Sequence, residues 1–342
     1  MRLGMNARNG GLDQRLSAVE LQVHSGATGS RGGLAPTPDG MHLRTMRWSL
    51  CRVAALPLLL LAGCGGLLLR PDAAQQTDLP AGVALRSGQI ASATGCTLDY
   101  RLYGPATQLP AAAGSGAPAR GGDWVILAHG FLRSQARMQG LAGAMAADGM
   151  QVATLDFCNQ KPWAGRHVQN GRDMVALARH LGAERVVYAG FSAGGLAALL
   201  AGRADPRTVG IVTLDLVETG GLGVGAARQL DKPLLALAGE PTNCNALDNG
   251  RAVLRATDRA RVQRIAGAGH CDFEAPTDGL CELVCADPDG AERTHRAQVI
   301  AGATAAAVAL FAGDADGWAA GAAPDAGPGP DTQAGGAHLR QP

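Results

Sequence analysis

The stretch RVVYAGFSAGG at 185–195 constrains the fold of this chain more than any other part of it. A short apolar run at 186–189 meets the GFSAG turn at 190–194, and an alanine- and leucine-rich segment follows. This order predicts a strand, a sharp turn and a helix, with Ser192 at the apex in a strained backbone conformation. The N-terminus of that helix would favour an anion formed beside the serine. We predict that Ser192 is a nucleophile; the alternative is a glycine-rich turn without chemistry, which small-residue chains form by chance.

A serine hydroxyl is a weak nucleophile at neutral pH and needs a general base, which an acid holds in one tautomer. In a G-x-S-x-G hydrolase the partners follow along the chain as serine, acid and histidine. His270, in the string GAGH at 267–270, follows the last predicted strand and is the candidate base. His129 precedes Ser192 in the chain, so we expect it to brace a turn rather than to act as the base.

Four carboxylates compete for the role of the acid. Asp215 ends the apolar run 211–214, one strand after the nucleophile. A carboxylate at the end of a buried strand is costly unless it is paired, which favours a histidine partner for Asp215. Glu240 lies in the loop after the next strand, and Glu218 and Asp248 are the remaining alternatives.

An oxyanion formed during acyl transfer needs two backbone donors, and the loss of one raises the barrier by about 3–4 kcal/mol. We expect one donor to be the N–H of Ala193, directly after the nucleophile. The other is expected from Phe131, in the turn that follows the apolar run 124–128. This chemistry requires no metal and no cofactor.

Segments with strand and helix patterns alternate along the chain. Predicted strands cover 82–90, 96–103, 124–128, 152–155, 186–189, 209–214, 233–238 and 261–266. One predicted helix follows Ser134, which can cap it, and another follows Ser192. Further predicted helices cover 170–181, a short region ending at Leu230, 247–256 and 293–311. Such alternation predicts an α/β fold with a mostly parallel sheet flanked by helices. Only residues 216–232 separate Asp215 from the next strand, so we expect no large cap domain and an open site.

The N-terminal part of the chain has the composition of a leader. Residues 1–45 show no periodicity and are expected to have no fold, with translation starting at Met46 or Met41. Residues 46–63 combine a basic start with an apolar core, as export signals do. They end in LAGC at 61–64, which resembles a bacterial lipobox and implies that Cys64 is lipidated. The alternatives are a plain cleaved signal and an uncleaved anchor; glycines at 63, 65 and 66 interrupt the latter.

Export would place the chain on the periplasmic face of a bacterial membrane. Gly65 after Cys64 resembles the pattern of outer-membrane lipoproteins. A tether at 64–81 and a disordered tail at 313–342 would then flank one domain at 82–312. Outside the leader and the lipobox the cysteines are Cys96, Cys158, Cys244, Cys271, Cys281 and Cys285. Their even number in an oxidising compartment predicts disulfides, with at least one within 244–285. A zinc site at 271, 281 and 285 is the disfavoured alternative, because no second ligand pair has suitable spacing.

Four motifs carry a resemblance to a known family: AHGF at 128–131, GFSAGG at 190–195, TLDLV at 213–217 and GAGHCDFE at 267–274. Over about residues 82–312 the chain resembles the α/β-hydrolase superfamily. Within it, the chain is similar to the branch of chlorophyllases, platelet-activating-factor acetylhydrolases and dienelactone-hydrolase-like esterases. That branch carries its acid after the strand that follows the nucleophile, which supports Asp215. Phe191 stands where many of these enzymes have histidine or another residue, which is a departure from the branch. Asp272 and Glu274 are expected to be hydrogen-bonding loop residues.

These observations predict an exported, lipid-anchored serine hydrolase, carboxylesterase- or lipase-like, that cleaves carboxylic esters of small molecules or lipids. The alternatives are an amidase or thioesterase on the same residues, and a catalytically silent envelope lipoprotein that binds a lipid or a partner. The net charge of +1 gives no reason to expect nucleic acid as a partner. Phe131, Phe157, Trp163 and Phe191 are candidates for the pocket wall, with ordinary core packing as the alternative.

Overall fold

The computed structural model describes residues 79–92, 94–109, 121–158, 165–285 and 293–321. The predicted signal peptide, Cys64, most of the tether and Trp163 lie outside these residues.

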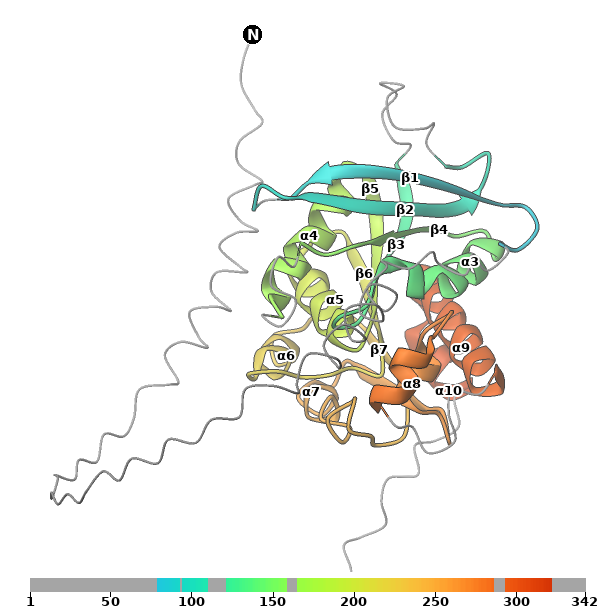
Figure 1. The fold of residues 1–342 in the computed structure, drawn as a ribbon. Helices are drawn as coiled ribbons and strands as arrows, with labels where there is room; N and C mark the ends of the chain where they lie inside the picture. Colours follow the sequence, from blue (N-terminus) through green and yellow to red (C-terminus); the bar gives the residue numbers. More distant parts are fainter. Residues whose placement is uncertain (1–78, 93, 110–120, 159–164, 286–292, 322–342) are drawn as a thin grey trace, which may run out of the picture. The chain divides into compact units, whose positions relative to one another are not determined.

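The described strands form one sheet of eight, in the order β1-β2-β4-β3-β5-β6-β7-β8 (Figure 1). β1 (Val83–Ala91) and β2 (Thr97–Pro105) make an antiparallel pair, and β2 also runs antiparallel to β4. All other neighbours are parallel: β3 (Gly122–Ala128), β4 (Gln151–Leu155), β5 (Ala183–Phe191), β6 (Thr208–Leu214), β7 (Leu234–Ala238) and β8 (Ala260–Arg264). The predicted mostly parallel sheet is therefore confirmed.

The central strands are apolar along their length because helices cover both faces of the sheet. All five residues of β7 are buried, as are the last five of β3. The parallel register pairs Ala128 with Gly190 and Phe191 with Leu214, so that β3, β5 and β6 end at one edge. The loops that follow these strands meet at that edge, and they carry the candidate site.

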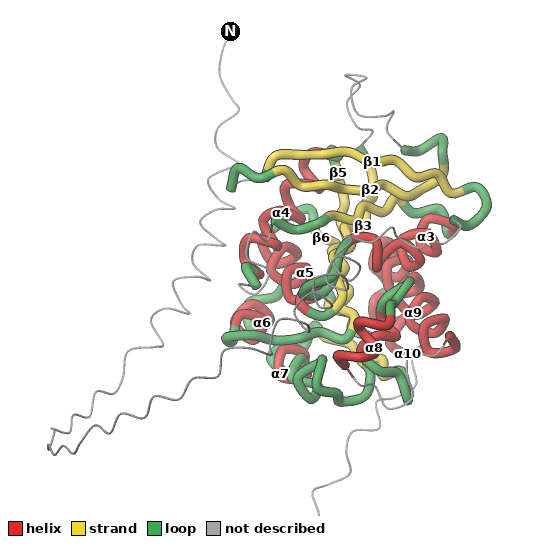
Figure 2. The backbone as a smooth tube through the Cα atoms, in the orientation of Figure 1, coloured by secondary structure: helices red, strands yellow, loops and turns green. Residues whose placement is uncertain are grey.

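Two layers of helices flank the strands (Figure 2). On one face lie α4 (His167–His180), α5 (Ala193–Ala204), α6 (Leu222–Ala227) and α7 (Arg251–Leu254), which pack with Tyr188 and other side chains into one core. On the other lie η1 (Gln135–Met138), α3 (Gln139–Ala147), α9 (Arg293–Ala312) and α10 (Ala315–Gly321), which pack around Leu237 and Phe191. The short segments η3 (His270–Phe273) and α8 (Gly279–Cys285) follow β8. α9 is long and apolar enough to cross a membrane, but its buried side chains belong to the second core.

Two predicted helix starts are wrong. Ser134 precedes the 3-10 turn η1, and its side chain makes no capping bond; the Gln135 N–H donates instead to Asp156 Oδ1 at 2.7 Å. The predicted helix at 247–256 is reduced to α7, because Ala246, Leu247 and Asp248 adopt left-handed φ angles of 51°, 58° and 62°. Three such residues in a row cannot belong to a right-handed helix.

The predicted disordered tail begins too early. α10 extends the ordered domain from the predicted end at 312 to Gly321. Trp318 packs against the core of α3 and α9, and its Nε1–H donates to the Gly302 carbonyl at 3.4 Å. Asp316 pairs with Arg261 on β8 at 2.9 Å. One large side chain and one ion pair therefore anchor a segment whose composition is otherwise typical of a tail.

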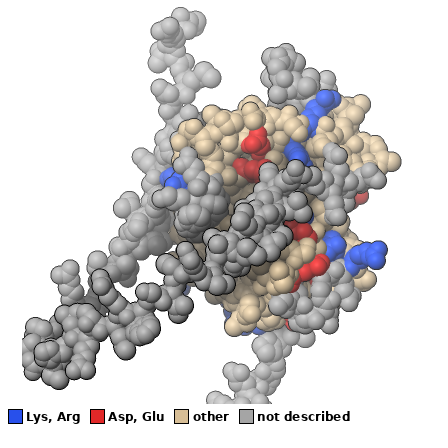
Figure 3. All heavy atoms as spheres, in the orientation of Figure 1, with Lys and Arg blue, Asp and Glu red and all other residues tan. Residues whose placement is uncertain are grey.

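Charged side chains are dispersed over the described surface. On the face shown in Figure 3, acidic and basic groups form small separate clusters, and most of the described surface carries neither. On the described part of this face the two signs are interspersed, which agrees with the net charge of +1.

Candidate active site

Ser192 occupies the turn between β5 and α5. Its φ and ψ are 56° and −122°, a conformation that L-residues avoid and that marks functional turns. The Ser192 N–H donates to the Leu214 carbonyl at 2.8 Å, which fixes the turn to β6. A Cβ on Gly190 would collide with the Gly194 carbonyl, and a Cβ on Gly194 would collide with the His129 carbonyl. The glycines of the motif are thus required by close backbone contacts.

The structure brings Ser192, His270 and Asp215 into one hydrogen-bonded chain. Ser192 Oγ lies 3.1 Å from His270 Nε2, and His270 Nδ1 lies 2.5 Å from Asp215 Oδ2. The three residues are 6%, 5% and 2% exposed. A hydroxyl, an imidazole and a carboxylate in this order can transfer the serine proton to the histidine while the acid fixes its tautomer.

Asp215 is held by two further groups. The Gly239 N–H donates to its Oδ1 at 3.0 Å, and Asn245 Nδ2 lies 3.3 and 3.2 Å from its two oxygens. Asn245 is fully buried, and its own Oδ1 accepts the Thr242 N–H at 2.8 Å. The sequence did not predict a role for Asn245. In the loop after β7 only carboxylates were candidates for contact with His270, whereas Asn245 carries an amide that contacts Asp215 instead.

The other candidate acids contact other partners. Glu240 Oε1 accepts the Gly267 N–H at 3.1 Å. Asp248 pairs with Arg264 at 2.8 Å, and Glu218 accepts the Val224 N–H at 2.9 Å. Among the described residues, Asp215 is therefore the carboxylate in contact with His270.

The turn after β3 lies against Ser192. A Cβ built on Gly130 would be 3.2 Å from Ser192 Cβ, so Phe131 follows directly at the site. His129 Nδ1–H donates to the Gly130 carbonyl at 2.8 Å, and its Nε2 accepts the Phe157 N–H at 3.4 Å. These two bonds brace the turn, and burial lowers the pKa of His129, while Asp156 opposes that effect. The N–H of Ala193 is in the first turn of α5, where helix amides have no intrahelical acceptor; the oxyanion roles of Phe131 and Ala193 stay predictions.

Buried acids support the segment that carries His270. Asp272 Oδ2 accepts the Gly269 N–H at 3.0 Å, just before His270. Glu274 accepts two bonds from Arg133, at 2.6 and 2.7 Å, which tie this segment to the turn after β3. Burial raises the pKa of Glu274, and the Arg133 pair opposes that effect. Both acids act as hydrogen-bonding loop residues.

Three disulfides are present in the described residues. Cys271 and Cys281 join η3 to α8, Cys244 and Cys285 join the loop of Asn245 to the end of α8, and Cys96 is bonded to Cys158. The prediction of a bridge within 244–285 is confirmed. The sulfur atoms of Cys271, Cys281 and Cys285 lie within 4.8 Å of one another, but each is in a disulfide and none is a thiolate that could bind zinc.

Comparison with solved structures identifies the fold. A ferulic acid esterase from Streptomyces cinnamoneus is similar over 70% of this chain and 91% of its own, with a TM-score of 0.50 and 18% sequence identity. The chain has an α/β-hydrolase fold. A dienelactone hydrolase-like promiscuous phosphotriesterase from metagenomic libraries matches 67% of this chain and 99% of its own, with a TM-score of 0.49 and 17% identity. No family model matches the sequence, and no curated protein is significantly similar to it.

Several exposed apolar side chains lie on three segments that are linked to the one carrying His270. We call them the apolar rim: Phe131, Leu132, Leu247, Leu280, Leu283 and Val284, which are between 43% and 79% exposed. Arg133, which follows the first two, pairs with Asp278 at 2.8 Å, just before α8. The Cys244–Cys285 bond ties the loop of Leu247 to the other end of α8. The three segments that carry the rim are therefore linked to one another by an ion pair and a disulfide.

The aromatic candidates for the pocket wall divide between the site and the core. Phe191 is buried with its ring centroid 4.6 Å from that of His270, and Phe131 is in the exposed rim. Phe157 packs against the core of α4 and α5 and contacts the His129 ring.

Proposed function

We propose that this chain is a serine hydrolase that cleaves carboxylic esters. The observation that carries the proposal is the hydrogen-bonded chain from Ser192 through His270 to Asp215, at 3.1 and 2.5 Å. The likeness to a ferulic acid esterase supports the fold on which such a site is built.

In the proposed reaction, Ser192 Oγ attacks the ester carbonyl while His270 Nε2 takes its proton. Asp215 accepts the Nδ1–H bond and stabilises the imidazolium that forms. The N–H groups of Ala193 and Phe131 hold the oxyanion of the tetrahedral intermediate. When the intermediate collapses, His270 gives its proton to the leaving alcohol. Water then attacks the acyl-serine by the same route, which releases the acid and restores Ser192.

The surroundings of the site favour an apolar ester. The apolar rim offers hydrocarbon contacts on three connected segments, and Phe191 lies beside the His270 ring. Exposed apolar clusters of this kind mark ligand or lipid contact surfaces. A substrate with a hydrocarbon acyl or alcohol group would cover them.

We also propose that the enzyme is exported and anchored through a lipid on Cys64. Three disulfides in the described residues are typical of proteins from oxidising compartments. Mass spectrometry of the mature N-terminus from membrane fractions tests the anchor. A diacylated or triacylated Cys64 is expected; an unmodified chain that retains residues 46–63 would contradict it.

The activity is tested with a fluorophosphonate probe and p-nitrophenyl esters of varied chain length. Wild type should label on Ser192 and hydrolyse the esters, and Ser192→Ala should neither label nor turn over. His270→Ala and Asp215→Asn should lower kcat by about 10³-fold or more. Ser87→Ala, on exposed β1 far from the sheet edge of the site, is the matched serine control.

Matched amide and thioester substrates separate the ester hydrolase from an amidase or thioesterase on the same residues. A folded protein that neither labels nor turns over any of the three substrate classes would contradict the enzyme and favour a silent binding protein.

A further inference from the structure

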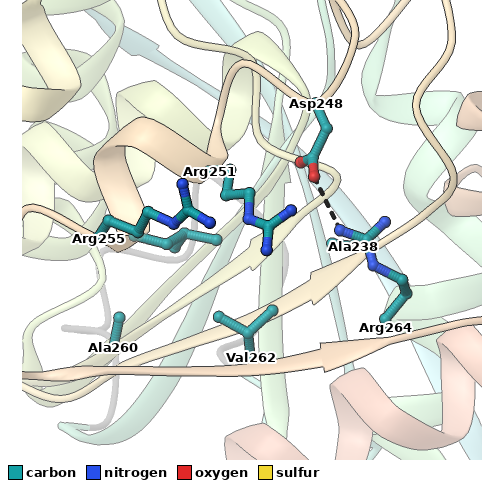
Figure 4. Close-up of a pocket in the computed structure, with 8 residues that line it drawn as sticks. Ala238, Asp248, Arg251, Arg255, Ala260, Val262 and Arg264 are labelled. Atoms are coloured by element: carbon teal, nitrogen blue, oxygen red, sulfur yellow. Dashed lines mark hydrogen bonds and ion pairs between the residues drawn. The ribbon is translucent and has the colours of Figure 1, made fainter. Parts of the chain in front are cut away.

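A second hollow lies away from Ser192, between α7 and the edge strand β8. Its volume is about 140 Å³, and its polar lining consists of Arg251, Arg255, Arg264 and Asp248. In Figure 4 the side chains of Arg251 and Arg255 extend from the helix over Val262, and Arg264 extends from the strand toward Asp248. Since a water molecule takes up about 30 Å³ in the liquid, the hollow has room for a small polyatomic group.

Positive charge in this hollow exceeds negative charge. Arg264 pairs with Asp248 at 2.8 Å and also donates to the Gly239 carbonyl. In the part of the chain that the structure describes, no carboxylate pairs with Arg251 or Arg255. Arg251 and Arg255 therefore bring two positive charges to this hollow that no described carboxylate pairs with.

Two neighbouring arginines, unlike Arg251 and Arg255, have carboxylate partners. Arg259 lies 3.5 Å from Asp258, and Arg261 lies 2.9 Å from Asp316. Arg251 and Arg255 are one helical turn apart, a spacing at which like charges repel. An anion between them would reduce that repulsion and supply acceptors that the described residues do not provide to their guanidinium N–H groups.

We propose that this hollow binds a phosphate group. Guanidinium groups bind phosphate oxygens through paired, charge-assisted hydrogen bonds, and an Arg-lined concave site is the usual protein solution for this ligand. Arg251 from α7, Arg255 just after this helix and Arg264 from β8 can contact different oxygens of one tetrahedral group. The phosphate is either the free ion or the headgroup of a phospholipid, since both present the same oxygens.

Binding is measured by calorimetry with inorganic phosphate at 0.15 M NaCl, on the purified full chain. We expect saturable binding with a Kd below about 1 mM, and a Tm that rises with phosphate as ligand linkage requires. The double variant Arg251→Ala/Arg255→Ala should bind at least tenfold more weakly. The control Arg228→Ala/Arg259→Ala removes the same charge from other exposed positions and should bind as wild type.

Vesicles of phosphatidylcholine, with and without phosphatidic acid, distinguish the two sources. Binding to phosphatidic acid that only the pocket variant loses assigns a lipid headgroup, and binding to inorganic phosphate alone assigns the free ion. No saturation by either ligand, or equal losses in the pocket and control variants, would overturn the proposal. The readout is binding, so its failure leaves the proposed hydrolase activity untouched.

Discussion

Asn245 donates its side-chain amide to both carboxylate oxygens of Asp215, at 3.3 and 3.2 Å, from a loop 30 residues further along the chain. The same amide group donates to the Glu240 carbonyl at 2.7 Å. Asn245 Oδ1 in turn accepts the N–H groups of Thr242 and Asp248, at 2.8 and 2.9 Å. The buried amide therefore joins the loop after β7 to the acid that contacts His270.

Replacement of Asn245 by alanine should lower kcat more than it changes KM. Without the amide, Asp215 keeps the Gly239 N–H but loses the group that contacts both oxygens, so its carboxylate is less well fixed against His270. Small displacements of catalytic groups cost about 10- to 100-fold in rate. Steady-state kinetics on a p-nitrophenyl ester measures the effect. Asn249→Ala is the control, since the Asn249 side chain bonds the backbone of Glu218 rather than Asp215. Equal losses in the two variants would contradict a specific role for Asn245.

Removal of Cys96–Cys158 should reduce stability more than removal of Cys271–Cys281, whereas removal of Cys271–Cys281 should reduce kcat more. Cys271–Cys281 closes a loop of 10 residues beside His270, and Cys96–Cys158 closes one of 62. Loop-closure entropy predicts losses of about 2.7 and 4.3 kcal/mol when each is replaced by a pair of serines. The kcat should fall more for the first pair, because Cys271 is adjacent to His270. Denaturant unfolding and ester kinetics on both double variants test this, and a larger kcat loss for Cys96→Ser/Cys158→Ser would show the expectation to be wrong.

A methyl group at Gly194 should damage the nucleophile turn. The added Cβ would lie 2.8 Å from the Ala128 carbonyl oxygen and closer still to that of His129. Overpacking of this kind costs about 1–3 kcal/mol, and here it shifts α5 away from β3, so kcat should also fall. Gly225→Ala is the matched control, because nothing lies within 4 Å of a Cβ there. That substitution, within α6, should raise the free energy of unfolding by about 0.5–1 kcal/mol, as measured by thermal or urea unfolding.

The sequence was sufficient to predict features that local chemistry determines. The GFSAG turn needs only its own glycines and the apolar residues before it, so the position of Ser192 between a strand and a helix is confirmed. Continuous apolar runs such as β7 identify buried parallel strands without knowledge of their neighbours. His270 and Asp215 were predicted as partners of Ser192 from their order along the chain. In a parallel sheet, residues that follow successive strands lie close together at one edge.

Features that depend on distant partners could not be predicted. Asn245 is an ordinary loop asparagine until the fold places it against Asp215. The left-handed residues at 246–248 break an expected helix through a loop geometry that the disulfide at Cys244 and the pair of Asp248 with Arg264 support. α10 depends on Trp318, whose packing against the second core compensates for a composition that otherwise indicates disorder.

Asp205 should make the stability of the protein depend on acid pH. It is buried and accepts Tyr188 O–H at 2.6 Å and Arg207 Nη2–H at 2.7 Å. Burial alone would raise its pKa, but the Arg207 and Tyr188 bonds lower the pKa below the ordinary value of 3.8. Because the folded-state pKa is the lower one, the stabilisation is complete well above pH 3.8 and is lost as the pH falls through the folded-state pKa.

Asp205→Asn should therefore lower the free energy of unfolding by about 2 kcal/mol at pH 7. This deficit relative to wild type should shrink below about pH 4. Urea unfolding between pH 3 and 7 measures the deficit. Asp231→Asn, at an exposed position, should track wild type throughout. A deficit that is constant with pH would mean that the charge of Asp205 contributes nothing.

Arg264 should act as a positioning residue for the site, independently of any ligand in the hollow. It donates to the Gly239 carbonyl, and the N–H of that same Gly239 donates to Asp215 at 3.0 Å. It also pairs with Asp248, whose N–H donates to Asn245. Arg264→Ala releases both ends of the loop that holds Asp215, so kcat should fall about tenfold with KM little changed.

Partial rescue separates this role from a general loss of stability. Arg264→Lys keeps a positive donor that can reach Asp248 or the Gly239 carbonyl but not both in the fork geometry of arginine, so its kcat should lie between those of wild type and Arg264→Ala. Arg261→Ala removes a charge from the same strand without contact to this loop and should keep wild-type kinetics. If Arg264→Ala lowers the Tm while kcat stays at the wild-type value, the residue stabilises the fold alone, and the two-step connection from β8 to Asp215 does not contribute to the reaction.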